Sequence, residues 1–386
     1  MTRRVRHPGE MRWETRLLAV IAMTLVIFGI VAVYGASSLE VVQGGGYRGS
    51  QFMMVQASGA VIGGVLMLIA SRVDYYRWRQ FAWPLLLLTV VILLPLVLPF
   101  PDSIAPSRNG SRRWLRLGPM SFQPSEVARL VVVIWCAMLA TKKGAQIREF
   151  KKGVMPFVVI LGLVFALVLL QPNLSMATLI AMLGGIVLFS AGAKIGHFML
   201  LLVGGAILAF DRIQAAQYRL ARAANFLNGG DLEGKGYQIN QALIGFGSGG
   251  LFGVGLGEGQ QKLGYLPYGY SDFLFSSIGE EWGFIGACMV IALYTTFCWL
   301  GFRIARTASD PFGQFLAIGL TATVGVTAFM HMAVNLKMMP TTGLTLPLMS
   351  YGRSSLVISM LGTGILINIG RMRGRARPAE KGSARA

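Results

Sequence analysis

The sequence predicts an all-α, polytopic membrane protein, a bundle of about ten transmembrane helices. Of the 386 residues, 54% are hydrophobic and only 13% are charged, with a mean hydropathy of +0.60. The apolar residues form long runs rather than the alternation typical of amphipathic elements. A helix needs roughly 20 mostly apolar residues to cross about 30 Å of hydrocarbon, and such runs recur along the whole chain.

Ten apolar runs qualify as spans. In chain order they are residues 17–36, 52–70, 81–98, 124–140, 154–170, 174–191, 198–210, 282–301, 312–332 and 354–370. The first run is too long for a secretory signal and lacks a small-residue cleavage site, so we expect it to be retained as a helix. The seventh and tenth runs are short. A long segment, 211–281, separates the seventh span from the eighth.

Basic residues lie at alternate ends of these spans and predict the topology. They cluster at 3–16, 72–79, 142–152 and 371–385, which the positive-inside rule assigns to the cytoplasm. Both termini are therefore expected to be cytoplasmic, with basic tails at 1–16 and 371–386 flanking a single transmembrane domain at 17–370. This topology accounts for most of the net charge of +19 without a nucleic-acid partner.

The loop before the fourth span is basic although the topology places it outside. Arg112, Arg113 and Arg116 lie on the face where arginine is normally depleted. Their cluster favours binding of an anionic group, of which phosphate is the first candidate. For any single arginine, attraction to anionic lipid headgroups is an equally good explanation.

The long outer segment 211–281 is rich in glycine, above all at 245–259. A loop of this length without structure of its own is usually functional. It is not a nucleotide-binding loop, because no strand precedes it and no Gly-Lys-Ser/Thr ends it. Glycine instead permits the tight turns and close approaches of a re-entrant segment.

Two groups of charges stand out within or beside the spans. Glu126 and Arg129 are three residues apart in the fourth span, so they share a helical face and can pair. The pair is either part of a functional site or a structural clip between helices. Asp272 lies among aromatic and apolar residues before the eighth span, where partial burial would raise its pKa toward that of a general base and nearby Lys262 would lower it.

Other reactive residues point to no further chemistry. Glu280 and Glu281 could share the role of Asp272, but interaction with the beginning of the eighth helix is the first interpretation. The three cysteines fall inside predicted spans, and the three histidines make no ligand spacing with them, so no metal site is predicted.

The residues quoted above belong to motifs that resemble the shape, elongation, division and sporulation (SEDS) polymerases, and the FtsW type more than the RodA type. The motifs are Gln123-Pro-Ser-Glu126-Val-Ala-Arg129-Leu, the glycine-rich 245–257 with Gln261-Lys-Leu-Gly-Tyr-Leu-Pro267, Asp272-Phe-Leu-Phe with Gly279-Glu-Glu-Trp-Gly, and Pro340-Thr-Thr-Gly-Leu-Thr-Leu-Pro-Leu-Met-Ser-Tyr-Gly352. They extend from the fourth span to the tenth.

The resemblance implies a peptidoglycan glycosyltransferase that polymerises lipid II, with Asp272 as the catalytic residue. It also implies a class B penicillin-binding protein as partner, together with other division proteins, and work at the septum in the cytoplasmic membrane. The sequence departs from the family pattern at Asn173, Ser175, Tyr270 and Ser271, and at Thr342, where a lysine is common. We hypothesise that Lys337 or Arg353 supplies the cation that Thr342 lacks.

A lipid-linked sugar polymerase needs a carboxylate to accept a proton from the attacking hydroxyl and cations to stabilise the departing diphosphate. Asp272 suits the first role. Candidates for the second are Arg112, Arg113, Arg116, Lys262, Lys337 and Arg353, and a divalent cation, Mg or Mn, could assist them. The alternatives are a flippase that moves the same lipid, a non-enzymatic scaffold for the crosslinking enzyme, and an elongation polymerase of the RodA type.

Overall fold

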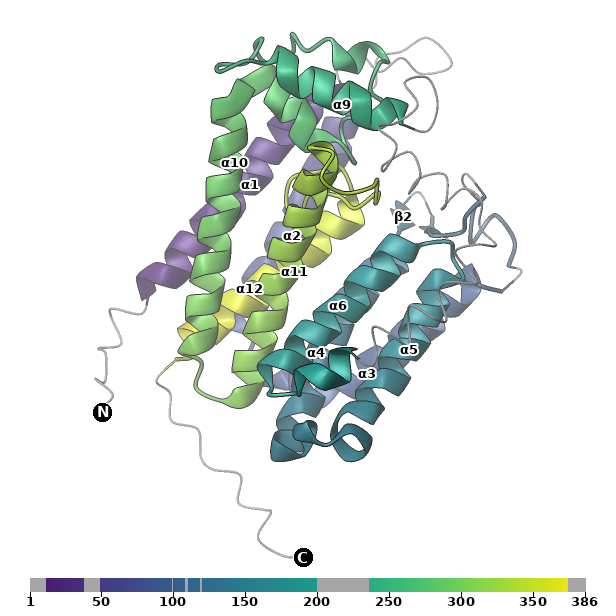
Figure 1. Ribbon diagram of the computed structural model, residues 1–386, viewed down its shortest axis with the longest axis vertical. Coiled ribbons are helices and arrows are strands. Elements are labelled where there is room, and N and C mark those ends of the chain that lie inside the picture. Colours follow the sequence, from purple (N-terminus) through teal and green to yellow (C-terminus); the bar gives the residue numbers. More distant parts are fainter. Residues whose placement is uncertain are drawn as a thin grey trace, which may run out of the picture.

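The computed structural model describes residues 12–37, 49–98, 100–107, 110–118, 120–199 and 236–373, which form a helical bundle (Figure 1). Its helices are α1 (Arg12–Ser37), α2 (Gly49–Arg72), α3 (Tyr76–Leu93), α4 (Pro124–Lys143), α5 (Met155–Leu169), α6 (Leu174–Ser190), α9 (Tyr237–Ser248), α10 (Leu274–Arg306), α11 (Pro311–Asn335) and α12 (Arg353–Arg371). A small antiparallel hairpin, β1 (Leu115–Leu117) and β2 (Met120–Phe122), precedes α4.

The predicted fold class is confirmed. Within the described residues, 8 helices are long and apolar enough to cross a membrane, and α6 is a shorter apolar helix. These nine helices coincide with nine of the ten predicted spans. The seventh predicted span, 198–210, lies almost entirely outside the described residues. The protein is therefore a multi-pass membrane protein.

The sequence explains where individual helices begin. Pro124 and Pro311 occupy the first turn of α4 and α11, where a missing N–H costs nothing. Asp310 caps α11, since its side chain accepts a hydrogen bond from Gly313 N at 3.0 Å. Asn173 caps α6 in the same way, accepting from Met176 N at 3.4 Å. Asn173, a departure from the family pattern, thus has a structural role.

The two ends of the bundle differ in charge and contacts. At the basic end, the beginning of α1 meets the ends of α10 and α12 around Glu14, Arg303 and Arg373. At the opposite end, which we call the outer end, Gln123 N donates to Ser354 Oγ at 3.2 Å, so β2 meets the beginning of α12. Helix α9 lies across this outer end (Figure 1).

Helix α4 forms the centre of the bundle. Its side chains are buried all around the helix, including Trp135 and Cys136 at 0% exposure. A helix that is apolar on every side requires neighbours on every side. It packs against α3, α6 and α11, and Glu126 and Arg129, which it carries, are buried within the bundle.

Helices α2 and α12 pack closely because small residues line their interface. A Cβ built on Gly63 would lie 2.6 Å from Met360 Sδ, and one on Gly59 would lie 3.1 Å from Arg353 Cγ. Glycines four residues apart let helix backbones approach in a membrane. This packing fixes the position of Arg353 relative to α2.

One carboxylate joins three helices at the basic end. Glu14 is 3% exposed and pairs with both Arg303 and Arg373, and the Arg303 guanidinium lies 5.2 Å and 5.3 Å from the ring centroids of Trp13 and Trp299. Burial lowers the pKa of Arg373 below its ordinary value, and the Glu14 carboxylate opposes that shift. The positive charge of buried Arg373 is therefore supported by the negative charge of Glu14.

Replacing Glu14 by glutamine is expected to destabilise the protein by about 3 kcal/mol, because it leaves Arg373 buried without a counter-charge. Arg303 is 31% exposed, so water can hydrate it after the substitution. The expected loss of stability is therefore at the low end of the range for breaking a buried ion pair. The thermal unfolding midpoint in detergent measures the effect. Glu149→Gln is the control: its pair with Lys152 spans 3.9 Å and is 60–75% exposed, so the midpoint should not move. Equal midpoints for both variants would contradict the prediction.

The structure corrects two expectations from the sequence. The eighth span begins at Leu274 rather than at residue 282, as one helix, α10, with a break at Gly283. The long segment between the seventh and eighth spans is not without structure, since it contains α9.

Candidate functional site

The segment 340–352, between α11 and α12, folds back into the outer half of the bundle. Leu346, Leu348 and Met349 are at most 1% exposed. A Cβ built on Gly29 of α1 would lie 2.5 Å from Met349 Cα, so the backbone of this segment touches the α1 backbone. Irregular backbone at this depth requires partners for its polar groups.

Buried side chains supply those partners. Gln56 of α2, at 0% exposure, donates to Met349 O (3.2 Å) and Ser350 O (3.0 Å) and accepts from Gly352 N (3.2 Å). His331 Nδ1 donates to Leu344 O at 2.8 Å. The segment 340–352 is therefore fixed from α2 and α11 at once.

Asp272 lies beside this segment at the outer end. Its N–H donates to Tyr268 O at 3.0 Å, and its own carbonyl accepts from Asn335 Nδ2 at 3.2 Å. A Cβ built on Gly343 would lie 3.7 Å from Asp272 Oδ2, and Gly343 has a φ of +68°. Only glycine adopts that conformation readily and leaves this approach to the carboxylate open. Asp272 is half-buried.

Asn335 ties the Asp272 segment to the end of α11. Besides the bond from its Nδ2 to Asp272 O, its Oδ1 accepts from Ser276 N at 2.9 Å, a donor in the first turn of α10 that also bonds Phe273 O. The adjoining Ser271 O accepts from Ser350 Oγ at 2.7 Å. Asp272 is thus held by its backbone from two directions, independently of its carboxylate.

Aromatic rings form one wall next to Asp272. Phe52, Tyr270 and Tyr351 have ring centroids 4.5–5.5 Å apart, and Tyr351 N donates to Tyr270 O at 3.1 Å. Tyr270 and Ser271, two of the departures from the family pattern, therefore contribute contacts to the segment 340–352. They fix the Asp272 segment to it.

Two predicted cations flank the segment that Asp272 contacts. Lys337 follows α11 with a φ of +55°, and its Nζ donates to Asn240 Oδ1 of α9 at 3.2 Å. Arg353 begins α12 with its stem along Gly59, and its buried Nε has no hydrogen-bond partner among the described residues. Lys337 is two residues from Asn335, and Arg353 is two residues from Tyr351; both neighbours are bonded to the Asp272 segment.

The other predicted cations lie in separate places. Arg112 pairs with Asp102 at 3.2 Å, and Arg113 donates to the carbonyls of Gln171 and Pro172 between α5 and α6. Arg116 is exposed on β1, without a pair for its side chain in the described part of the chain. Lys262 donates to Gly257 O. Arg112, Arg113 and Lys262 thus have structural contacts, whereas Arg116 lies on the hairpin that precedes Gln123 and α4, and Gln123 N donates to Ser354 of α12.

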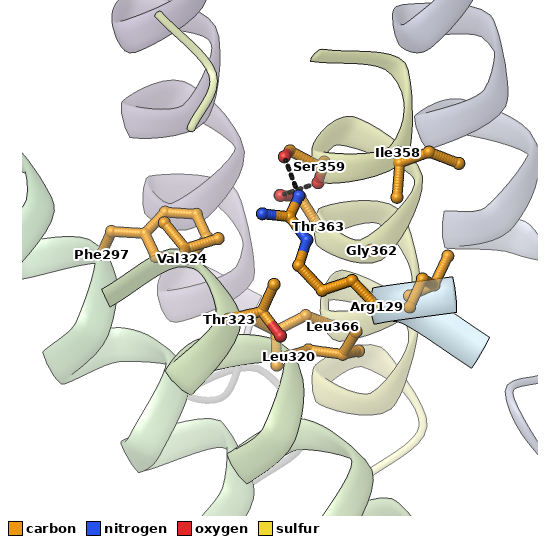
Figure 2. Close-up of a pocket in the computed structure, with 11 residues that line it drawn as sticks. Arg129, Phe297, Leu320, Thr323, Val324, Ile358, Ser359, Gly362, Thr363 and Leu366 are labelled. Atoms are coloured by element: carbon orange, nitrogen blue, oxygen red, sulfur yellow. Dashed lines mark hydrogen bonds between the residues drawn. The ribbon is translucent and has the colours of Figure 1, made fainter. Parts of the chain in front are cut away.

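Glu126 and Arg129 form the ion pair that their spacing predicts. Arg129 Nη2 lies 2.8 Å from Glu126 Oε2, and both side chains are at most 4% exposed. Figure 2 shows Arg129 pointing toward Ser359 of α12, to which it donates at 3.3 Å. The guanidinium borders a cavity of about 10 Å³, room for about one water molecule. The pair therefore joins α4 to α12.

Glu280 and Glu281 make structural contacts, but these are not the contacts with the beginning of the eighth helix that the sequence suggested. Glu280 accepts from Gln260 N at 2.7 Å and from Gln261 N at 3.2 Å, so it binds the end of the glycine-rich segment rather than the start of α10. Glu281 packs against Gly35 of α1, where a Cβ would meet its carboxylate. Neither of these contacts involves the segment 340–352.

The described residues bring no three histidine, cysteine, aspartate or glutamate side chains together as a metal site. The sequence analysis allowed a magnesium or manganese ion at the site. Among the described residues, Asp272 would then be a single carboxylate ligand for that ion. The steps proposed below use the side chains of this chain.

Sequence reasoning missed the residues that hold the site. The side chains of Gln56, His331 and Asn335 bond backbone groups of the segment 340–352 and of the Asp272 segment, and no motif pointed to them. Each is a polar residue within or at the end of an apolar helix and is at most 1% exposed. Polar residues at membrane depth are costly, and that signal could have found them.

Comparisons with known proteins identify the family of the chain. A family model described as "Cell cycle protein", for FtsW, RodA and SpoVE, matches residues 15–374. The chain belongs to this family. A probable peptidoglycan glycosyltransferase FtsW of Trichlorobacter lovleyi is 38% identical over 95% of both chains. Stage V sporulation protein E of Bacillus subtilis is 35% identical over 92% of this chain and 96% of its own.

Solved structures of the family share the fold. A chain from a peptidoglycan synthase complex, studied for the coordination of polymerization and crosslinking, superposes with a TM-score of 0.75 at 26% identity, over 93% of this chain and 98% of its own. The rod shape determining protein RodA of Thermus thermophilus gives 0.67 at 25% identity, over 93% and 97%. The resemblance inferred from the motifs is thereby confirmed.

Proposed function

We propose that this protein is a peptidoglycan glycosyltransferase that polymerises lipid II into glycan strands at the outer end of the bundle. The observation that carries the proposal is the position of Asp272. Its carboxylate lies against Gly343 of the segment 340–352, which Lys337 and Arg353 flank. FtsW-type relatives whose names state this activity support it.

Asp272 is proposed as the general base. Its carboxylate accepts the proton of the attacking sugar hydroxyl as that oxygen bonds to the anomeric carbon of the second substrate. The bond from the anomeric carbon to the lipid diphosphate breaks, and the electron pair leaves with the diphosphate. A backbone fixed by Asn335 and Tyr268 keeps the carboxylate in place for this transfer.

Lys337 and Arg353 are proposed to stabilise the departing diphosphate, with Arg116 and, to a smaller extent, Arg112, Arg113 and Lys262 as further candidates. The double variant Lys337→Gln/Arg353→Gln is expected to bind a polyprenyl diphosphate about a hundredfold more weakly, because two charge-assisted hydrogen bonds of about 1.5 kcal/mol or more each are lost. Titration of the ligand against the purified protein measures this. Lys152→Gln, at the basic end, is the control with unchanged affinity. Normal affinity in the double variant would exclude both cations.

The proposed function is tested with purified protein in liposomes that contain lipid II. A polymerase produces glycan strands, whereas a flippase only transfers labelled lipid II between leaflets, and a scaffold does neither. Polymer is the expected product. Translocation without polymer would favour the flippase.

We also propose that the protein works with a class B penicillin-binding protein and other division proteins at the septum of a bacterial cytoplasmic membrane. The relative from a peptidoglycan synthase complex supports a crosslinking partner. The greater similarity to FtsW supports division over elongation. A fluorescently tagged copy should gather at the septum; distribution along the side wall would favour a role like that of RodA.

A further inference from the structure

The glycine-rich residues 249–257 form an exposed apolar feature at the outer end, which we call the glycine hairpin. Phe252 is 80% exposed, and Leu251, Val254 and Leu256 are exposed as well. No charged residue occurs from 237 to 257. In water, four adjacent apolar side chains of this kind would be unfavourable, at about 25 cal/mol per Å² of apolar surface.

The glycine hairpin replaces the hydrogen bonds that α10 loses at its break. Gly283 has a φ of +68°, so carbonyls before it and N–H groups after it lack helical partners. The hairpin supplies four bonds: Val254 N to Glu280 O (3.0 Å), Gly255 N to Glu281 O (3.1 Å), Phe284 N to Gly250 O (2.9 Å) and Ile285 N to Leu251 O (3.2 Å). Irregular backbone at membrane depth needs protein partners of this kind for its polar groups.

The hairpin continues the lipid-facing surface of α10. Phe284 and Ile285 are each more than half exposed, and Met289 and Ile291 are exposed further along the same transmembrane helix. The hairpin is bonded directly to the first two of these residues. Its apolar side chains therefore lie beside a surface that faces lipid.

We propose that the glycine hairpin inserts its side chains into the outer leaflet of the membrane. The occupant of this surface is lipid, as the four backbone bonds to α10, the uncharged sequence 237–257 and the continuity with α10 indicate. Glycine is required where the segment meets α10, because a Cβ on Gly253 or Gly283 would strike backbone atoms of the other segment. Insertion fixes the depth of the first turns of α10, which begin two residues after Asp272.

Spin-label accessibility tests the proposal. In full-length protein carrying Cys288→Ala and Cys298→Ala, with Cys136 buried, a nitroxide is attached to Phe252→Cys. The protein is reconstituted in vesicles of phosphatidylethanolamine and phosphatidylglycerol, and collisions with oxygen and with a water-soluble nickel chelate are measured. Position 252 is 80% exposed, so the label does not disturb packing.

Two labelled positions calibrate the result. Ile291→Cys reports the lipid face of α10, and Ser103→Cys reports an exposed polar position near the outer end. The oxygen-to-nickel ratio at 252 is expected to equal that at 291 and to exceed that at 103. A ratio equal to that at 103 would place the hairpin in water. Shielding from both reagents would place it against protein. Either outcome overturns the proposal, whether or not the protein polymerises lipid II.

Discussion

Replacing Asp272 by asparagine is expected to reduce lipid II polymerisation about 100- to 10,000-fold, the range that general-base catalysis contributes. Asparagine has the size of aspartate but cannot accept the proton of the attacking hydroxyl. The fold should persist, because Asn335 and Tyr268 hold the backbone of Asp272 and not its carboxylate. Initial rates of polymer formation at equal protein concentration measure the loss.

A matched variant separates loss of the base from loss of charge in the outer region. Glu258→Gln removes an exposed carboxylate from the same outer segment and should leave the rate unchanged. Binding of lipid II to Asp272→Asn should remain close to that of the unaltered protein. If Asp272→Asn polymerised within a few-fold of that protein, the base would have to be another group.

Replacing Glu126 by glutamine is expected to destabilise the protein by about 3–5 kcal/mol, because Arg129 keeps its charge in the bundle without a counter-charge. The pair is 2.8 Å apart, with both side chains at most 4% exposed, so bulk water cannot hydrate Arg129 once the carboxylate is lost, and the neighbouring cavity has room for about one water molecule. The yield of folded protein and its thermal unfolding midpoint should both fall, and activity with them.

The double variant Glu126→Gln/Arg129→Met distinguishes a structural clip from a catalytic pair. Arg129 points to Ser359 of α12 and not to the Asp272 segment, so we expect a clip between α4 and α12 (Figure 2). Removing both charges should then restore most of the stability and the activity, since no buried charge is left unpaired. A double variant that is stable but inactive would instead show that the pair takes part in the reaction.

The start of α10 shows why some boundaries could not be read from the sequence. Residues 274–281, Leu-Phe-Ser-Ser-Ile-Gly-Glu-Glu, are too polar to extend an apolar run, so the predicted span began at 282. They are helical because Asn335 satisfies Ser276 N and the glycine hairpin satisfies the carbonyls of Glu280 and Glu281. Both partners are remote in sequence.

For the candidate site, too, the sequence revealed some features and only the tertiary structure revealed others. Motifs in the sequence named Asp272, Lys337 and Arg353 as candidates, and their proposed roles still await experiment. The motifs did not reveal that the segment between Lys337 and Arg353 folds against Asp272, or which contacts Arg112, Arg113, Lys262 and Lys337 make. Charge alone does not determine which cation is committed to a structural contact.

From the sequence alone, the spans and the Glu126–Arg129 pair could be predicted, because transfer into lipid and helical periodicity depend on residues close together in the chain. Only the tertiary structure decided how the segment 340–352 returns into the bundle and what lies beside Asp272. The bonds responsible join Gln56 to Met349, 293 residues apart, and Asn335 to Asp272, 63 apart. Such contacts form only when distant helices have packed, so no local pattern encodes them.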